Sequence, residues 1–186
     1  MNHHFFIDHV AYRRVMEDVD KSVVERLAQL AVYNRINTLS CINRVGRGWL
    51  GASLSCADVL TALYFHPEAV IAPEDEGRDY ILLSKGHAAV MQYAALAGLG
   101  IMSVEDLLLY NRQDGPQAHT DLRTRGIEAN SGSLGQTLSK ANGLALAGAR
   151  QVFVIMGDGE LQEGQNYEAM MMLHQYRLKQ IGRAHV

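Results

Sequence analysis

The segment Gln-Val-Phe-Val-Ile-Met at positions 151–156 constrains the fold more than any other part of this sequence. After its first residue it holds no polar side chain, and a Gly-Asp-Gly tripeptide follows it directly. A strand without polar alternation has to be buried on both faces, which is typical of a parallel sheet covered by helices. A second short apolar run, 79–83, ends in the same way at a polar loop, 84–87.

Helical patterns alternate with these two runs. Apolar residues recur at roughly helical spacing from Val19 to Asn43, and Ser55, three residues before Asp58, predicts a capped helix that continues to Phe65. Further helices are predicted over 88–99, over 103–110 with Ser103 and Asp106 as its cap, and over 165–178. A glycine-rich turn that leads into an Ala/Leu helix is predicted over 132–149, and a functional loop over 111–130. The sequence therefore predicts an α/β fold, a parallel sheet flanked by helices, with ligands at the carboxyl ends of the strands.

Composition limits the classes of function. The chain has 186 residues, of which 48% are hydrophobic and 20% charged, as in soluble globular proteins. Its net charge of -3 and scattered basic residues give no reason to expect nucleic acid as a partner. No apolar stretch reaches the ~20 residues of a membrane span. Two cysteines, Cys41 and Cys56, suit the reducing cytoplasm, where we expect this protein to act.

The tripeptide after the last predicted strand indicates a binding site. Gly157 and Gly159 permit a tight turn and close approach of the backbone, as in phosphate-binding loops, but Asp158 would repel a phosphate. The repulsion becomes attraction if a hard cation lies between them, and Glu160 and Glu163 add carboxylates to the same loop. We therefore interpret this loop as a site where Mg²⁺ bridges Asp158 to a diphosphate. An ordinary aspartate in a strand-to-helix turn is the alternative for the bare tripeptide.

The longer string GDGELQEGQNYEA, positions 157–169, resembles the diphosphate-site motif of transketolases almost residue for residue. Four other segments resemble that family in the same order along the chain: 51–65, 83–88, 117–119 and 132–136. Together they span roughly Asn37 to Leu178, and five ordered segments are far more specific than one motif. The resemblance implies the thiamine-diphosphate-binding fold and a two-carbon ketol transfer between sugar phosphates, dependent on thiamine diphosphate and Mg²⁺.

The resemblance also implies roles for residues at matching positions. His87 and His119 would be catalytic, as hydrogen-bond donors or proton shuttles for the sugar phosphate. Asp158 would be the Mg²⁺ ligand, and the cofactor-binding residues would be Gly132, Ser133, Leu134, Gly157, Asp158 and Gly159. Glu163 would lie at the contact with a pyrimidine-binding domain or subunit, and Glu168 would support that contact. We expect assembly with that partner as a dimer or heterotetramer, and an inactive chain without it.

One position departs from the family. Transketolases usually carry Gly-His-Pro-Gly where this chain has Gly-Trp-Leu-Gly at 48–51, and that histidine lies near the reacting substrate. Trp49 cannot shuttle a proton and has a single indole donor. We assign Trp49 to the substrate pocket and expect that the substrate differs from ordinary pentose phosphates, that another group replaces the histidine, or that catalysis is impaired.

The ends of the chain are interpreted separately. We divide it into an N-terminal extension, 1–18, a truncated diphosphate-binding domain, 19–180, and a non-native tail, 181–186. Translation of the sequencing-adapter codons ATC-GGA-AGA-GCA-CAC-GTC would give the last six residues. The asparagine that closes the family motif would fall just beyond Val186, so we expect an unpaired sheet edge after Leu178.

Two alternatives to a transketolase remain at this stage. The first is a deoxyxylulose-phosphate-synthase-like enzyme of the same thiamine-diphosphate superfamily, which would decarboxylate pyruvate. The second is a non-catalytic assembly subunit that keeps the fold, for which Trp49 is the direct support.

Overall fold

The computed structural model describes residues 6–75, 77–178 and 181–185, which divide into two compact units. Unit 1 consists of the chain up to Ala69 together with His87–Ala118, and unit 2 consists of Val70–Gly86 together with the chain from His119 onward. The chain therefore leaves unit 2 after Gly86 and returns to it after Ala118. The predicted domain boundaries at 18 and 180 are not tested by this division and stay predictions.

The predicted helices and strands follow one another in the expected order, and the structure adds short helices and a third strand, 181–185, that the sequence analysis does not predict. In chain order the elements are α1 (His9–Met16), α2 (Val23–Val45), α3 (Leu50–Ser55), α4 (Ala57–Phe65), β1 (Asp79–Leu83), η1 (Gly86–Ala88), α5 (Ala89–Gly98), α6 (Val104–Leu108), α7 (Thr137–Leu146), β2 (Gln151–Met156), η2 (Gly159–Gln162), α8 (Gly164–Gln175) and β3 (Ile181–His185). No helix of the described residues is both long and apolar enough to cross a membrane.

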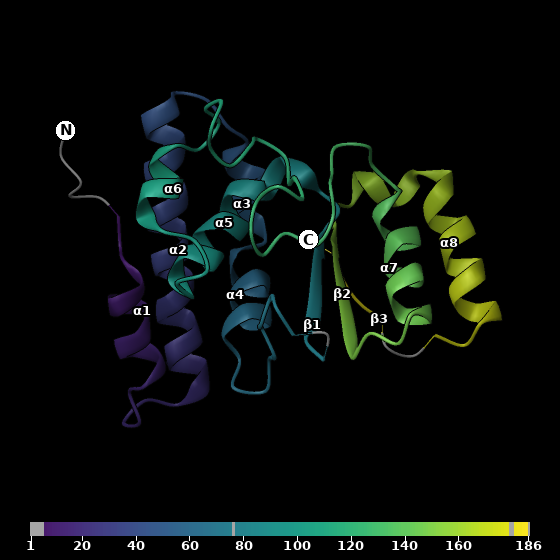
Figure 1. Ribbon diagram of the computed structural model, residues 1–186, viewed down its shortest axis with the longest axis horizontal. Helices are drawn as coiled ribbons and strands as arrows, with labels where there is room; N and C mark the ends of the chain where they lie inside the picture. The colour runs from purple at the N-terminus through teal and green to yellow at the C-terminus, as the bar shows by residue number, and fades with distance from the viewer. Residues whose placement is uncertain (1–5, 76, 179–180, 186) are drawn as a thin grey trace. The chain divides into compact units, whose positions relative to one another are not determined.

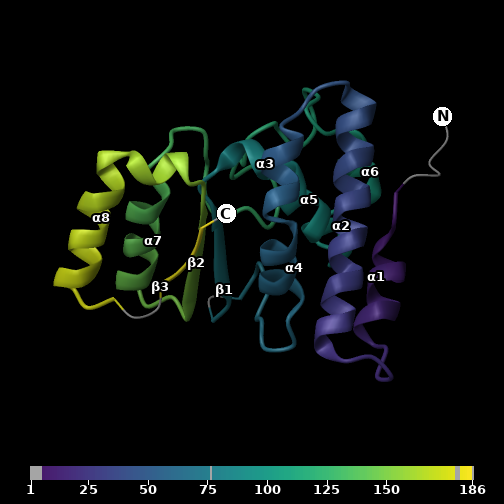
Figure 2. The same cartoon turned by 180° about the vertical axis from the view of Figure 1, so that it is seen from behind.

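Unit 1 is helical, and α5 lies at its centre. Every residue of α5 is buried, and the helix contacts α1, α2, α3, α4 and α6. A helix that is apolar on all sides requires such complete cover. Figure 2 shows α1, α2 and α4 as neighbours in this unit. Both cysteines are buried and free, and burial raises the pKa of the Cys41 thiol to about 12, which keeps it protonated.

A buried polar network joins three helices of unit 1. The hydroxyl of Tyr12 in α1 donates to Asn34 in α2 at 2.9 Å, and the Asn34 amide donates to Thr61 Oγ1 in α4 at 2.8 Å. All three residues are fully or almost fully buried. Burial also raises the pKa of Tyr12, so that its hydroxyl remains a donor. The segment 1–18 thus includes a helix packed into the core of unit 1, with Asp8 as its N-terminal cap.

Unit 2 contains the sheet, and the predicted parallel arrangement is confirmed. The strand order is β1-β2-β3, and both pairings are parallel. Val152, Val154 and Met156 on one face of β2 pack in a core with Leu138 and Ala141 of α7. Figure 1 shows α7 and α8 side by side next to β2. Ile155, on the other face of β2, is also fully buried, as expected for an inner parallel strand.

Two local expectations are wrong. The edge of β2 is paired, because the backbone of β3 runs beside it from Val152↔Ile181 to Met156↔His185. Ladder hydrogen bonds come from the backbone and do not require a Val/Ile-rich composition. In the second case, Ser55 does not cap α4: it is the last residue of α3, and its hydroxyl donates to the Ala52 carbonyl at 3.0 Å.

Candidate functional site

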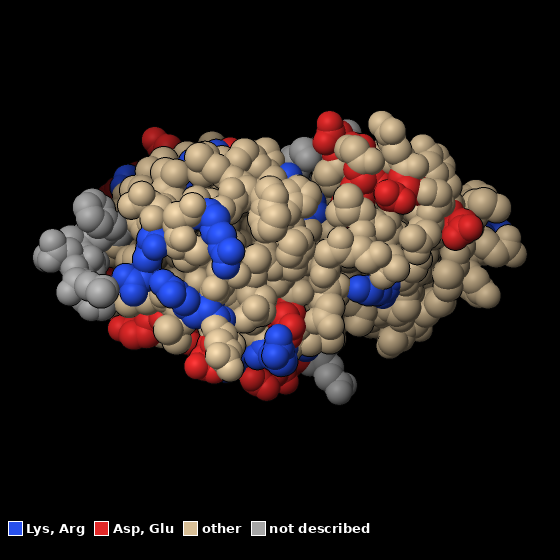
Figure 3. All heavy atoms as spheres, turned by 90° about the horizontal axis from the view of Figure 1, so that it is seen from above, with Lys and Arg blue, Asp and Glu red and all other residues tan. Residues whose placement is uncertain are grey.

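The predicted Mg²⁺ ligand, Asp158, lies at the carboxyl end of β2, where the chain turns into η2. It is exposed, and within the described residues its carboxylate caps no backbone N–H and forms no ion pair. Figure 3 shows a group of Asp and Glu side chains on the surface above the start of α8. Among the described residues there is no cluster of three or more His, Cys, Asp or Glu side chains that could hold a metal. Mg²⁺ bound together with a diphosphate needs only one or two carboxylates, so the accessible Asp158 fits that role.

Glu160, two residues further, is turned into the protein. It is only 3% exposed, and its Oε1 accepts hydrogen bonds from the backbone N–H of Gly135 at 2.9 Å and from the hydroxyl of Ser84. Its Oε2 accepts from the backbone N–H of Gly157 at 3.2 Å. One carboxylate therefore joins the end of β1, the glycine-rich loop before α7 and the end of β2. The interpretation that Glu160 offers its carboxylate to an open cation site is wrong, because its oxygens accept hydrogen bonds inside the fold.

The glycine-rich loop 132–136 is held close to the segment that follows β2. Gly132 and Gly135 have left-handed φ values of 121° and 83°, which side chains other than glycine rarely adopt. A Cβ atom on Gly135 would lie 2.7 Å from Cβ of Glu163, so Glu163 stands directly against the loop. Ser133 is exposed and Leu134 half-buried. The loop thus offers backbone at its surface, as close approach of a cofactor requires.

His119 lies beside the same loop in unit 2. A Cβ atom on Gly132 would be 3.6 Å from Cδ2 of His119, and one on Gly86 would be 3.0 Å from that atom and 2.1 Å from Oγ of Ser131. Ser131 Oγ accepts a hydrogen bond from the backbone N–H of Thr120 at 3.1 Å. Because Gly86 has no side chain, His119 and Ser131 can occupy the space beside it at the end of β1.

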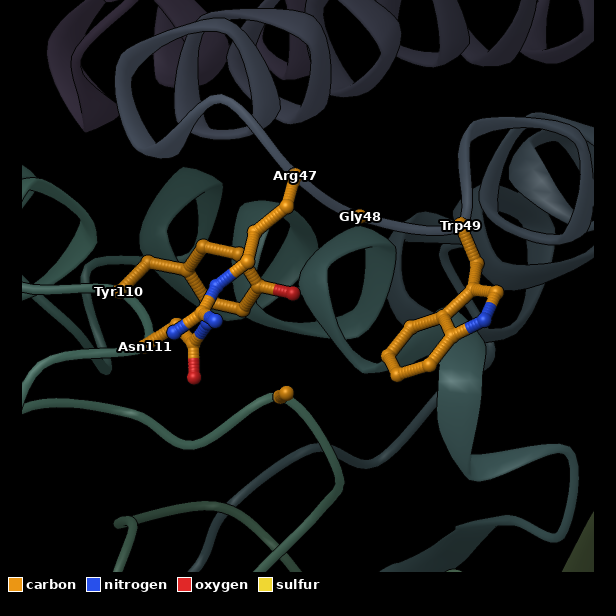
Figure 4. Close-up of a pocket in the computed structure, with 6 residues that line it drawn as sticks. Arg47, Gly48, Trp49, Tyr110 and Asn111 are labelled. Carbon is orange, nitrogen blue, oxygen red and sulfur yellow. The ribbon is translucent and has the colours of Figure 1, made fainter.

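His87 and Trp49 are brought together in unit 1. Their rings meet edge to face, with centroids 6.3 Å apart and an interplanar angle of 68°. Trp49 is 47% exposed and lines a cavity of about 490 Å³, shown in Figure 4, with Arg47, Gly48, Tyr110, Asn111 and Ala118. The sequence predicts a pocket at Trp49 but does not predict its polar neighbours. The cluster Gly46-Arg47-Gly48 after a long predicted helix could have indicated them, because the two glycines predict a turn and the residue between them is charged.

The two predicted partner-contact residues are both exposed: Glu163 directly precedes α8 as its N-cap residue, and Glu168 lies in the first half of that helix. The backbone at the start of α8 is fixed by Asn166, whose amide donates to the Glu160 carbonyl at 2.6 Å. The start of α8, where these two carboxylates lie, is therefore fixed to the same loop that contains Asp158.

Comparisons with known proteins identify the family of this chain. The family described as transketolase, thiamine diphosphate binding domain, matches residues 27–182. An apulose-4-phosphate transketolase subunit from Actinobacillus succinogenes is 38% identical over 160 residues, which cover 80% of this chain and 56% of the relative. A 6-deoxy-6-sulfo-D-fructose transketolase subunit from Clostridium sp. strain MSTE9 is 43% identical over 151 residues, which cover 76% of this chain and 54% of the relative.

A solved structure of transketolase from Campylobacter jejuni matches with a TM-score of 0.77 and 28% identity, over 86% of this chain and 28% of that one. The chain spans about half the length of the two curated relatives. Because the family match covers most of its residues, the chain belongs to the transketolase family, within the thiamine diphosphate binding domain.

Proposed function

We propose that this chain is the thiamine-diphosphate- and Mg²⁺-binding part of a transketolase that transfers a two-carbon ketol unit between sugar phosphates. The observation that carries the proposal is the arrangement at the end of β2. There Asp158 is exposed and, within the described residues, unpaired, whereas Glu160 accepts hydrogen bonds from the surrounding loops. When bound, thiamine diphosphate supplies carbanion stabilisation. Asp158 would hold the Mg²⁺, and the backbone of Gly132, Ser133, Leu134, Gly157 and Gly159 would lie against the cofactor.

The two histidines would serve the substrate. An imidazole can donate or accept a proton near neutral pH, which suits a group that handles the hydroxyls of a sugar. His119 lies against Gly132 of the proposed cofactor loop, and His87 lies against Trp49 at the cavity of unit 1. We assign both to hydrogen bonding and proton transfer at the substrate.

A partner is part of the proposal. Both curated relatives described above are named as subunits, and this chain spans about half of each. We propose that it works with a pyrimidine-binding domain or subunit, contacted by Glu163 and supported by Glu168, in a dimer or heterotetramer. The names of the two relatives refer to a sugar phosphate and a sulfo sugar, which supports a substrate that carries an acidic group.

The test compares the chain alone with the chain co-expressed with the pyrimidine-binding transketolase domain of the same genome. With Mg²⁺, thiamine diphosphate, a ketose-phosphate donor and an aldose-phosphate acceptor, we expect turnover only from the pair. Turnover by the chain alone would contradict the need for a partner. A pair that binds the cofactor but turns over no sugar would favour the non-catalytic assembly protein, the alternative that Trp49 supports, and release of CO₂ from pyruvate would favour the synthase-like enzyme.

Replacement of Trp49 tests its role in the pocket. We expect Trp49→His in the pair to change the ratio of kcat/KM values among sugar phosphates several-fold, because the exposed indole lines the cavity and contacts His87. Affinity for thiamine diphosphate should stay the same. Leu50→Ala, at the exposed neighbour, is the control. A parallel loss of cofactor affinity in Trp49→His would show that the indole holds the fold rather than the substrate.

A further inference from the structure

Thr120, the residue that follows His119, is tied to the segment that leads into the glycine-rich loop. Its backbone N–H donates to Ser131 Oγ at 3.1 Å, and the backbone N–H of Ser131 donates to the Thr120 carbonyl at 3.1 Å. The hydroxyl oxygens of these two residues are 2.7 Å apart, and Thr120 Oγ1 donates to the Ala129 carbonyl at 2.9 Å. We call these four hydrogen bonds the clasp.

The imidazole of His119 packs against two glycines. A Cβ atom on Gly86 would lie 3.0 Å from Cδ2 of His119, and one on Gly132 would lie 3.6 Å from the same atom. Gly86 lies at the end of β1, and Gly132 begins the loop that we assign to the cofactor. Because these two neighbours of the ring are bare backbone, the position of the ring depends on how the backbone at 119–120 is held.

Ser131 connects the clasp to both glycines. A Cβ atom on Gly86 would lie 2.1 Å from Oγ of Ser131 and 2.7 Å from its Cβ, so Ser131 packs against the same glycine as His119. Ser131 also directly precedes Gly132, whose φ of 121° is one that other residues rarely adopt. One half-buried serine therefore lies between the end of β1, the residue after His119 and the start of the glycine-rich loop, all within unit 2.

The chain between the two halves of the clasp is closed by a separate hydrogen bond. The backbone N–H of Leu122 donates to Oδ1 of Asn130 at 2.8 Å, and both residues are exposed. Thr120, by contrast, is only 3% exposed. Removal of Ser131 Oγ would therefore leave a buried N–H without its acceptor, whereas removal of the Asn130 amide would leave an N–H that water can reach.

We propose that Ser131 is a positioning residue, whose hydroxyl fixes His119 relative to the glycine-rich loop. The proposal deepens the proposed function and rests on it. A group that acts on a substrate has to be held within about 0.5 Å of its productive position, and a displacement of about 1 Å can lower the rate roughly 100-fold. An alanine at position 131 would free the backbone on the C-terminal side of His119, while Gly132 and Gly135 would keep the loop in its conformation.

A double-mutant cycle tests whether Ser131 acts through His119. In the pair of this chain and the pyrimidine-binding domain, we expect Ser131→Ala to lower kcat about tenfold and to change the affinity for thiamine diphosphate by less than about twofold. In the His119→Ala background the same change should lower kcat by less than about twofold, because no ring is left to position. Ser131→Thr keeps the hydroxyl and should retain most of the rate. Ser139→Ala, at an exposed serine of α7, is the control for the substitution itself.

Nuclear magnetic resonance of the 186-residue chain gives a measurement that needs neither turnover nor a partner. In Ser131→Ala the amide of Thr120 should exchange faster with solvent, and the resonance of the proton on Cδ2 of His119 should shift, because this atom faces the two glycines. Asn130→Ala is the matched control, since it removes the bond to Leu122 and leaves the clasp intact. It should leave the His119 resonance unchanged. Circular dichroism checks that each variant is folded.

The proposal is overturned if Ser131→Ala retains full kcat, or if it costs as much in the His119→Ala background as in the unaltered pair. Equal losses of kcat and of cofactor affinity would also overturn it, because the clasp would then shape the cofactor loop rather than place the histidine. A shift of the His119 resonance in Asn130→Ala as large as in Ser131→Ala would have the same consequence. An unaltered pair without any turnover would reject the proposed function, and the resonance of His119 in the chain alone would still decide whether Ser131 holds that ring.

Discussion

Asp158→Ala is expected to weaken the Mg²⁺-dependent binding of thiamine diphosphate to the paired enzyme by on the order of 100-fold and to remove turnover with it. The diphosphate is anionic, and the cation that neutralises it needs a carboxylate from the protein. Asp158 is exposed at the end of β2, whereas Glu160 is committed to three hydrogen bonds. Glu160, the carboxylate two residues away, therefore cannot replace the lost ligand.

Calorimetric titration of the cofactor at fixed Mg²⁺ measures this effect. Glu68→Ala, at an exposed carboxylate of unit 1, is the control for loss of one negative charge and should leave the affinity unchanged. Asp158→Asn should retain part of the affinity, because an amide oxygen can still ligate the cation without neutralising it. Unchanged affinity in Asp158→Ala would remove this residue from the metal site.

The buried strand and the loops at its end were predictable from the sequence because their signals are local. The apolar run 151–156 became β2 with those same ends, and the predicted run 79–83 became β1. The helix predicted over 103–110 also begins as expected at Ser103, which forms a capping box with Asp106: each side chain binds the backbone N–H of the other residue. In each case neighbouring residues contain all the information that the structure uses.

Several expectations failed because they depended on contacts distant in sequence. Whether Glu160 faces a cation or the interior is decided by Gly135, Ser84 and Gly157, and two of these come from other loops. The cavity of unit 1 likewise joins residues 47–49 to residues 110–118, which no periodicity connects. The role of Tyr12 in the core of unit 1 belongs to the same class, since its partner Asn34 lies on another helix.

Glu160→Ala is expected to destabilise the fold of the chain by about 3 kcal/mol, since it leaves buried donors without an acceptor. The backbone N–H groups of Gly135 and Gly157 and the hydroxyl of Ser84 would lose their partner, and each unsatisfied buried donor costs about 1–3 kcal/mol. Water that enters the vacated space offsets part of this loss. The loss should appear as a lower urea midpoint with an unchanged m-value.

Two further variants separate the role of Glu160 in the loops from a general loss of packing. Glu160→Gln keeps an oxygen for Gly135 and Ser84 and turns an amide donor toward the N–H of Gly157, so its stability should lie between those of the unaltered chain and Glu160→Ala. Gln162→Ala, at an exposed position of η2, should change stability by less than about 0.5 kcal/mol. Hydrogen exchange gives the local readout: in Glu160→Gln the amide of Gly157 should exchange faster while that of Gly135 stays protected. If both amides keep their protection in Glu160→Ala, the carboxylate does not hold the ends of β1 and β2 to the glycine-rich loop. The cofactor site would then owe its shape to the backbone conformation of that loop alone.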